Sequence, residues 1–177
     1  MPRHDASTAE VLVFTFKEGL LSAVAHDLKL KALRFTLELT DASARLEVEL
    51  GSLVVVTAMQ QGVEAPGALP GFARREIEKN LVSSQVLAVA RYPVAKFEST
   101  RVTDSEVEGQ LSLHGVTRAV CGVRKDSAQS LVAEFRLDQR EFAMKPYSAM
   151  LGTLRLRPEV VVRVSAPKGT HSGARSV

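Results

Sequence analysis

The most regular feature of the chain is a two-residue alternation of apolar and polar side chains. It runs through residues 35–39, 46–50, 107–113, 131–138 and 154–157. Less regular runs of the same kind lie at 11–16, 24–30, 53–57, 97–102, 116–123 and 160–164. Successive side chains of a strand point to opposite faces, so this alternation predicts half-buried strands of an antiparallel sheet around a single core.

One segment has a helical spacing instead. From about residue 71 to 87, Ile77, Leu81 and Val86 recur three to five positions apart among charged residues. The preceding stretch, 60–71, holds two prolines and three glycines and is typical of a loop. We therefore predict one helix, about 71–87, packed across an end or side of the sheet, and a mainly β fold.

Short polar stretches at 41–43, 103–105 and 125–127 separate the predicted strands and indicate turns.

The length of 177 residues fits one domain, which we place at 10–164. We expect residues 1–9 to be a flexible N-terminus. Residues 165–177 have almost nothing to bury and are expected to form a disordered tail.

Composition and charge narrow the class of protein. Hydrophobic residues make up 45% of the chain, which is typical of a folded soluble protein. The chain has 23 Lys and Arg against 20 Asp and Glu, and no aromatic side chains interleave its basic stretches, so nucleic-acid binding is not expected. The single cysteine and the lack of an apolar N-terminal segment favour a cytoplasmic location. Mixed charges on the helix predict at most transient membrane contact.

Several common catalytic and metal-binding patterns are missing. The sequence has no P-loop, dinucleotide fingerprint, nucleophile elbow or His-Glu-x-x-His pattern. Its four histidines are far apart, so we expect no metal site and no cofactor. Cys121 has the strand parity of Ala119 and Val123, which favours a small packed residue over a nucleophile.

The neighbouring residues of two histidines indicate where each side chain lies. His26 shares parity with Leu28, so its imidazole is expected on the apolar face, either as a hydrogen-bonded core residue or against a ligand headgroup. His114 and Gly115 are typical of a turn, and a structural role is expected there.

Two stretches together resemble the YceI-like family. The first is Tyr92-Pro-x-x-x-Phe97-x-Ser99, and the second is Gly109-x-Leu111-x-x-x-Gly115-Val-Thr117. Their order and spacing match that family's strand and following hairpin, and Val24-Ala-His26 resembles its early strand. The resemblance covers roughly residues 10–164. Many members are secreted; here no signal peptide is expected, because the first residues show no apolar segment.

The resemblance implies an extended, lipocalin-like antiparallel β-barrel of about eight strands. Characterised members of the family hold a long isoprenoid, quinone-like or fatty-acyl chain inside the barrel, and they often form dimers. We therefore expect an apolar, lipid-like ligand, and a homodimer is one expected state of this chain. The unpaired edges of antiparallel sheets also favour self-association.

The inward-facing residues of such a barrel decide what it binds. If the even-numbered residues of the first run face inward, Leu12, Phe14 and Phe16 line the interior; parity alone leaves the facing of this run open. The full set of predicted ligand-binding residues is Phe14, Phe16, Val24, His26, Leu28, Phe35, Leu37, Leu39, Phe97, Leu111, Leu113, Phe135 and Leu137. Each of them could equally be plain core.

Three functional classes remain open at this point. The first is a non-catalytic carrier or sequestering protein for an apolar long-chain ligand. The second is a barrel with a filled interior that acts as an interaction or stress-response module. The third is an enzyme acting on a bound lipid, for which His26 is the one visible titratable candidate. The aliphatic and Phe character of the inward positions favours the first class, because burial of hydrocarbon supplies the binding free energy.

Overall fold

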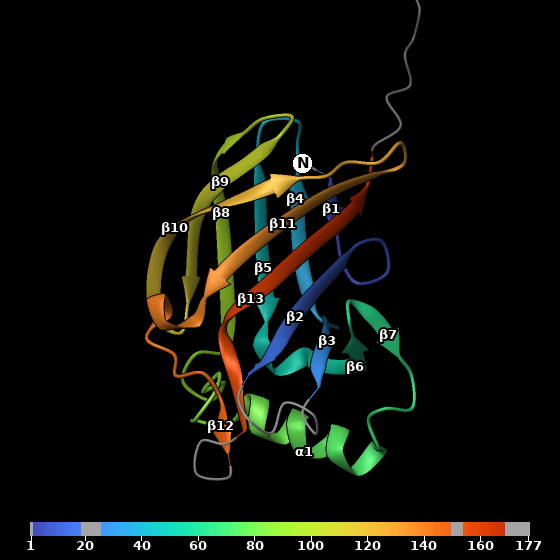
Figure 1. Ribbon diagram of the computed structural model, residues 1–177. Coiled ribbons are helices and arrows are strands. Elements are labelled where there is room, and N and C mark those ends of the chain that lie inside the picture. The colour runs from blue at the N-terminus through green and yellow to red at the C-terminus, as the bar shows by residue number, and fades with distance from the viewer. Residues whose placement is uncertain (1, 19–25, 150–153, 169–177) are drawn as a thin grey trace, which may run out of the picture.

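The computed structural model describes residues 2–18, 26–149 and 154–168, which form a curled antiparallel sheet and a helix (Figure 1). The helix α1 spans Gly71–Val82. Within these ranges the strands are β1 (Arg3–His4), β2 (Glu10–Glu18), β3 (Asp27–Ala32), β4 (Phe35–Leu39), β5 (Ala44–Glu49), β6 (Leu53–Gln60), β7 (Val63–Ala65), β8 (Val94–Val102), β9 (Glu106–Leu113), β10 (Val116–Arg124), β11 (Ser130–Asp138), β12 (Ser148–Ala149) and β13 (Leu154–Pro167). The predicted mainly β, antiparallel fold is confirmed.

The described residues contain thirteen strands, whereas the expected barrel has about eight. Three of them, β1, β7 and β12, have only two or three residues, which is too short for an alternating pattern to show. The ten longer strands match the alternating runs of the sequence.

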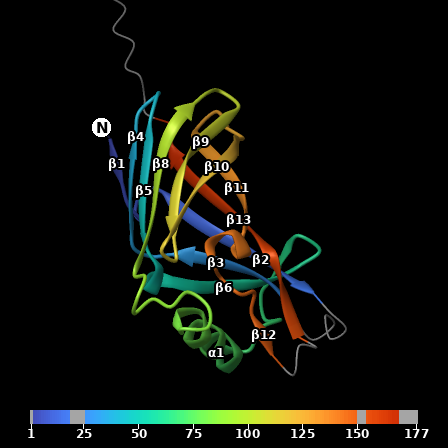
Figure 2. The ribbon, with the colours of Figure 1, turned by 90° about the vertical axis from the view of Figure 1, so that its left-hand side faces the viewer.

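Hydrogen bonding joins the strands in the order β1-β4-β5-β8-β9-β10-β11-β13-β2-β3-β6-β7, and β12 pairs with β13. Figure 2 shows the strands wrapping around a common interior, with α1 lying across one end. Among the described residues, the end strands β1 and β7 do not pair with each other, so backbone hydrogen bonds do not close the barrel.

A sharp corner forms where β3 continues into β4 and β5 continues into β6. A short 3-10 helix, Leu50–Ser52, connects the second pair. The buried Ser52 hydroxyl accepts from the Arg34 amide at 3.0 Å and donates to the Glu49 carbonyl at 2.7 Å. Ser52 therefore satisfies backbone groups that the bend removes from the strand ladder.

Helix α1 packs on the sheet through one side. Ile77 and Leu81 contact the cluster of Leu28, Leu30 and Val55. The helix was expected to reach residue 87 but ends at Val82. The Ser83 hydroxyl donates to the Asn80 carbonyl at 2.6 Å, and the chain then turns back through residues 83–92.

Regular structure extends beyond the predicted domain bounds at residues 3–4 and 165–167. In the N-terminal segment, Arg3 and His4 pair with β4, and Ala6 and Ala9 pack against the main core cluster. The structure therefore places a short strand and two packed side chains where a flexible segment was expected. At the other end β13 reaches Pro167, where the buried Ala166 pairs with Leu131. Residues 169–177 of the expected tail lie outside the described residues.

The predicted turns are confirmed. His114 and Gly115, with φ of 51° and 78°, form the two-residue connection between β9 and β10. Positive φ at both central residues is the hairpin turn that suits the strand twist. The stretches 41–43, 103–105 and 125–127 lie in the connections β4–β5, β8–β9 and β10–β11, whose tips lie at the end opposite α1 (Figure 1).

A charge network on the outer face joins β11 to its neighbours. The Glu134 carboxylate accepts from Lys125 Nζ and Arg163 Nη2, both at 3.0 Å. The hydrogen bond from Lys125, followed by that from Arg163, holds the pKa of Glu134 below its ordinary value. A carboxyl with a lowered folded-state pKa stabilises the fold above its unfolded pKa, and this stability is lost as the pH falls through the folded pKa.

Glu134→Gln should therefore lower the free energy of unfolding by about 1 kcal/mol near pH 7. Because protonation removes the same interaction from the natural chain, the difference should shrink as the pH falls below the ordinary Glu pKa. Urea unfolding at a series of pH values measures it. Glu106→Gln, at an exposed carboxylate, is the control. A difference that stays constant down to acid pH would contradict the ion-pair explanation.

Candidate functional site

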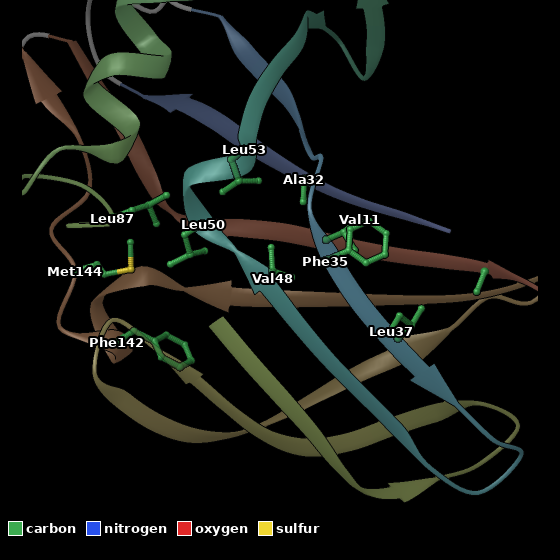
Figure 3. Close-up of a cluster of buried hydrophobic side chains, with 11 residues drawn as sticks. Val11, Ala32, Phe35, Leu37, Val48, Leu50, Leu53, Leu87, Phe142 and Met144 are labelled. Atoms are coloured by element: carbon green, nitrogen blue, oxygen red, sulfur yellow. The ribbon is translucent and has the colours of Figure 1, made fainter. Parts of the chain in front are cut away.

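The curled sheet encloses a cavity of about 420 Å³. Its wall is mostly aliphatic, with Phe97, Phe135 and Phe142 as the aromatic members. Figure 3 shows part of this lining, including Leu37 and Val48 on β4 and β5 and, near α1, the group Leu50, Leu53, Leu87, Phe142 and Met144. The volume lies within the range of about 300–1,000 Å³ that is usual for small-molecule sites.

Seven of the predicted ligand-binding residues lie in the cavity wall. They come from β4, β8, β9 and β11 and are Leu37, Leu39, Phe97, Leu111, Leu113, Phe135 and Leu137. Their placement follows the alternation of the sequence, because in each strand the charged residues of the opposite parity face outward. Their contact with a ligand stays a prediction.

The predicted facing of the N-terminal run is wrong. The odd-numbered residues Val11, Val13 and Thr15 line the cavity, whereas Leu12, Phe14 and Phe16 do not. The reason is the register between β2 and β13. Val13 pairs with Val162, which also lines the cavity, and directly paired residues point to the same face. On the outer face, the guanidinium of Arg163 lies 5.1 Å from the centre of the Phe14 ring.

The remaining predicted residues lie elsewhere. Phe35 is buried in the main core cluster and Leu28 packs beneath α1, but neither lines the cavity. His26 is half-buried just before β3 and is not part of the wall. The structure corrects these three placements: the side chain of Leu28 packs against Ile77 and Leu81 of the helix, that of Phe35 packs within the core cluster, and His26 precedes the strand. Val24 lies outside the described residues.

Sequence parity missed the residues that close the cavity near α1. Leu81 comes from the helix, Val86 and Leu87 from the turn after it, and Phe142 and Met144 from the segment after β11. Irregular segments have no period from which a facing can be deduced. Their apolar character was the one available signal.

Polar wall residues gather at the end formed by the hairpin turns. They are Thr40, Asp41, Ser43, Asp104, Arg124 and Asp126, while two further polar wall residues, Thr15 and Gln139, come from β2 and from the segment after β11. Arg124 forms an ion pair with Asp126 and donates to the Thr103 carbonyl at 2.7 Å. Burial raises the pKa of Asp126, but the hydrogen bonds from Arg124 and the Val132 amide and the nearby positive charges of Arg124 and Lys168 together outweigh it, and the pKa lies below its ordinary value. The cavity is thus charged at the turn end and apolar at the helix end.

A sequence profile of the YceI-like domain matches residues 4–166. The chain belongs to the YceI-like family. Its fold is similar to that of BcnA from Burkholderia cenocepacia, with 12% identity, a TM-score of 0.62, and coverage of 90% of this chain and 96% of that chain. A YCEI protein of Campylobacter jejuni is similar at 8% identity and a TM-score of 0.53, over 81% of this chain and 86% of that chain.

A mutant of the Campylobacter jejuni protein, solved with a monobromobimane guest, is similar at 8% identity and a TM-score of 0.55. That match covers 81% of this chain and 86% of that chain. At these identities the likeness concerns the fold alone. No curated protein sequence matches the chain.

The cysteine of this YceI-like chain is exposed on β10, so the expectation of a packed Cys121 is wrong. The cavity-facing parity of that strand belongs to Val120. Desolvation, with Glu106 and Glu108 nearby, raises the pKa of the Cys121 thiol and disfavours a reactive thiolate. In the described ranges, no three His, Cys, Asp or Glu side chains are grouped as metal ligands, and no helix is long and apolar enough to cross a bilayer.

Two glycines leave room for the aromatic rings of the YceI-like cavity. A Cβ at Gly109 would lie 2.5 Å from the Phe97 ring and would also contact the Glu98 carbonyl. A Cβ at Gly122 would lie 2.6 Å from the Phe135 ring. The two rings meet edge to face with centres 5.3 Å apart. The missing side chains therefore let both rings lie close against the sheet.

Gly109→Ala should destabilise the fold by about 1–3 kcal/mol, because the new methyl group overlaps both a ring and the backbone. Thermal unfolding measures the loss. Gly71→Ala is the matched control, since its Cβ would meet only Arg75 Nη1, at 4.0 Å. Equal stability of Gly109→Ala and the natural chain would show that the Phe97 ring moves freely.

Thr15 is the polar residue of the wall nearest the middle of β2. It is 9% exposed, and its hydroxyl has no hydrogen-bond partner among the described residues. A buried hydroxyl without a partner costs about 1–3 kcal/mol. Thr15→Val should therefore raise the free energy of unfolding by about 1 kcal/mol, measured by urea unfolding. Lower stability of the variant would mean that the hydroxyl is paired in solution. Thr100→Val, at an exposed position of β8, is the control.

Proposed function

We propose that this protein binds an apolar long-chain ligand, of the isoprenoid, quinone-like or fatty-acyl class, inside its barrel and carries or sequesters it. The observation that supports the proposal is the cavity of about 420 Å³ with a mostly aliphatic wall. Membership of the YceI-like family supports the same ligand class.

The binding free energy would come from burial of the chain. Each buried methylene contributes about 0.8 kcal/mol. Ten or more methylenes together exceed the lower part of the estimated association cost of about 4–15 kcal/mol. Affinity then needs few polar contacts, which suits a wall whose polar groups gather at one end.

The two other functional classes receive less support. A barrel whose side chains fill the interior leaves no volume of this size. An enzyme needs a nucleophile or an acid and a base within hydrogen-bond reach of a bound substrate. His26 is not part of the wall, and the Asp126 carboxylate there already accepts a hydrogen bond from Arg124. We therefore propose a binding role without catalysis, in a cytoplasmic protein, with a homodimer as one candidate assembly.

Native mass spectrometry of freshly purified protein tests the proposal. A mass in excess of the chain, removable by organic extraction and matching a lipid in the extract, is the expected result. The same spectrum gives the oligomeric state. Protein that carries no added mass and then fails to take up cis-parinaric acid, a fluorescent long-chain probe, would refute the carrier function.

Ala133→Phe should abolish uptake of cis-parinaric acid, because Ala133 lies in the wall and the ring would project into the cavity. Ala119→Phe is the matched control. It makes the same change on the exposed face of the neighbouring strand β10 and should bind as the natural chain does. Fluorescence titration measures both, with circular dichroism to verify folding. Equal binding by the two variants would place the probe outside the cavity.

A further inference from the structure

Helix α1 carries apolar side chains on both of its faces. Ile77 and Leu81 face the barrel and pack on its core clusters. On the other side, Phe72 is 71% exposed and Val82 is 37% exposed. A helix that only covers a barrel needs one apolar face, so the exposed pair is unexplained by the fold.

The exposed pair belongs to a regular stripe. Phe72, Arg75, Lys79 and Val82 follow each other at spacings of three, four and three residues, which places all four on one face of a helix. We call these four residues the outer stripe. Arg75 and Lys79 are exposed between the two apolar ends.

The charge around the outer stripe is positive. Within α1, Arg74, Arg75 and Lys79 are exposed, and Glu76 is the one exposed acid of the helix. The other acid of the helix, Glu78, turns inward and accepts a hydrogen bond from the Val55 amide at 2.9 Å. The first turn has no acidic residue, so the positive end of the helix dipole is not neutralised there.

We propose that the outer stripe docks this protein on the surface of an anionic lipid bilayer. Exposed Phe and Val side chains enter the boundary between headgroups and acyl chains, and Arg75 and Lys79 pair with anionic headgroups, as in interfacial helices. The helix is short and its charges are mixed, so the contact is reversible.

A second copy of the chain fits the outer stripe less well. In a twofold dimer centred on α1 the same patch occupies both sides of the interface. Arg75 and Lys79 of one copy would then face Arg75 and Lys79 of the other, with only Glu76 to offset them. Repulsion between these like charges favours the anionic bilayer as the occupant.

Docking through α1 would connect the bilayer to the cavity. Leu81, on the opposite face of the same helix, is part of the cavity wall. No residue of α1 is fully buried. Besides its apolar contacts, the helix forms the Glu78–Val55 hydrogen bond with the sheet. Asn80 Nδ2 also lies 3.4 Å from the Tyr147 hydroxyl. Exchange of ligand between the bilayer and the cavity rests on the proposed function. Docking of the helix on the bilayer does not.

Sedimentation with vesicles tests the docking. Vesicles of pure phosphatidylcholine are compared with vesicles containing 30% phosphatidylglycerol, at low and at high salt. We expect the natural chain to partition onto the anionic vesicles and to dissociate as salt rises. Phe72→Ser and Arg75→Glu should each lower the partition coefficient, Arg75→Glu by at least about fivefold.

Matched controls carry the same changes on the sheet. Val123→Ser removes an exposed apolar side chain of β10, and Arg136→Glu reverses an exposed charge of β11. Both should leave partitioning unchanged. No binding to anionic vesicles, or an equal loss in stripe and control variants, would overturn the proposal. So would conversion of a dimer to a monomer by Phe72→Ser, because the outer stripe would then be an interface between copies.

The outcome is separable from that of the ligand experiment. Vesicle sedimentation needs no loaded cavity, and cis-parinaric acid uptake needs no vesicle. A chain that takes up the probe but ignores anionic vesicles would lose the docking proposal alone. A chain that docks but never takes up the probe would lose the carrier function alone.

Discussion

The interior of this barrel is decided by a constraint on strand pairing: directly opposed residues of neighbouring antiparallel strands must share a face. The ladder between β2 and β13 shows the constraint at work. Arg163 of β13 is exposed and bonded to Glu134, so its partner Leu12 is directed to the outer side as well. The neighbouring pair Val13 and Val162 is then directed inward. A shift of one residue would place a guanidinium in the apolar cavity, which is why the register is strongly specified.

The same constraint explains how much of the fold the sequence could predict. In β4, β8, β9 and β11 the two parities differ clearly, with Glu, Lys or Arg on one and Leu or Phe on the other, and all of the predicted residues on these strands except Phe35 line the cavity. Residues 11–16 are nearly all apolar, so their own pattern does not choose a face. The choice comes from a partner strand about 150 residues away in sequence, and the charge of Arg163 was the signal that could have revealed it.

Two further parts of the structure could not be read from local patterns. The short strand β1 has no period of its own and exists because β4 offers it an edge. The closure of the cavity by Leu87, Phe142 and Met144 depends on segments without regular structure, whose positions follow from the strands that they connect. The hairpin turn at His114 and Gly115 could be predicted from the sequence. Its two central residues need a positive φ, and this requirement depends on local residue types alone.

The cavity persists because its larger side chains lie along the wall. Gly109 and Gly122 have no side chains beneath the rings of Phe97 and Phe135, so these rings occupy the inner surface of the sheet and leave the centre open. An open apolar interior forgoes packing contacts that a filled core would have. Any molecule that binds the folded chain but not the unfolded one would stabilise it.

The two ends of the cavity differ in a way that suggests how a bound chain would be oriented. Arg124 and Asp126 keep charge at the turn end, where their ion pair is satisfied within the protein. The helix end is lined mainly by apolar side chains, among them Leu81, Leu87 and Met144. A ligand with one polar terminus would therefore place that terminus at the turns and its hydrocarbon toward α1. The outer stripe would then bring the bilayer to the hydrocarbon end, so that transfer would begin with the tail and would not require the headgroup to cross the apolar cavity.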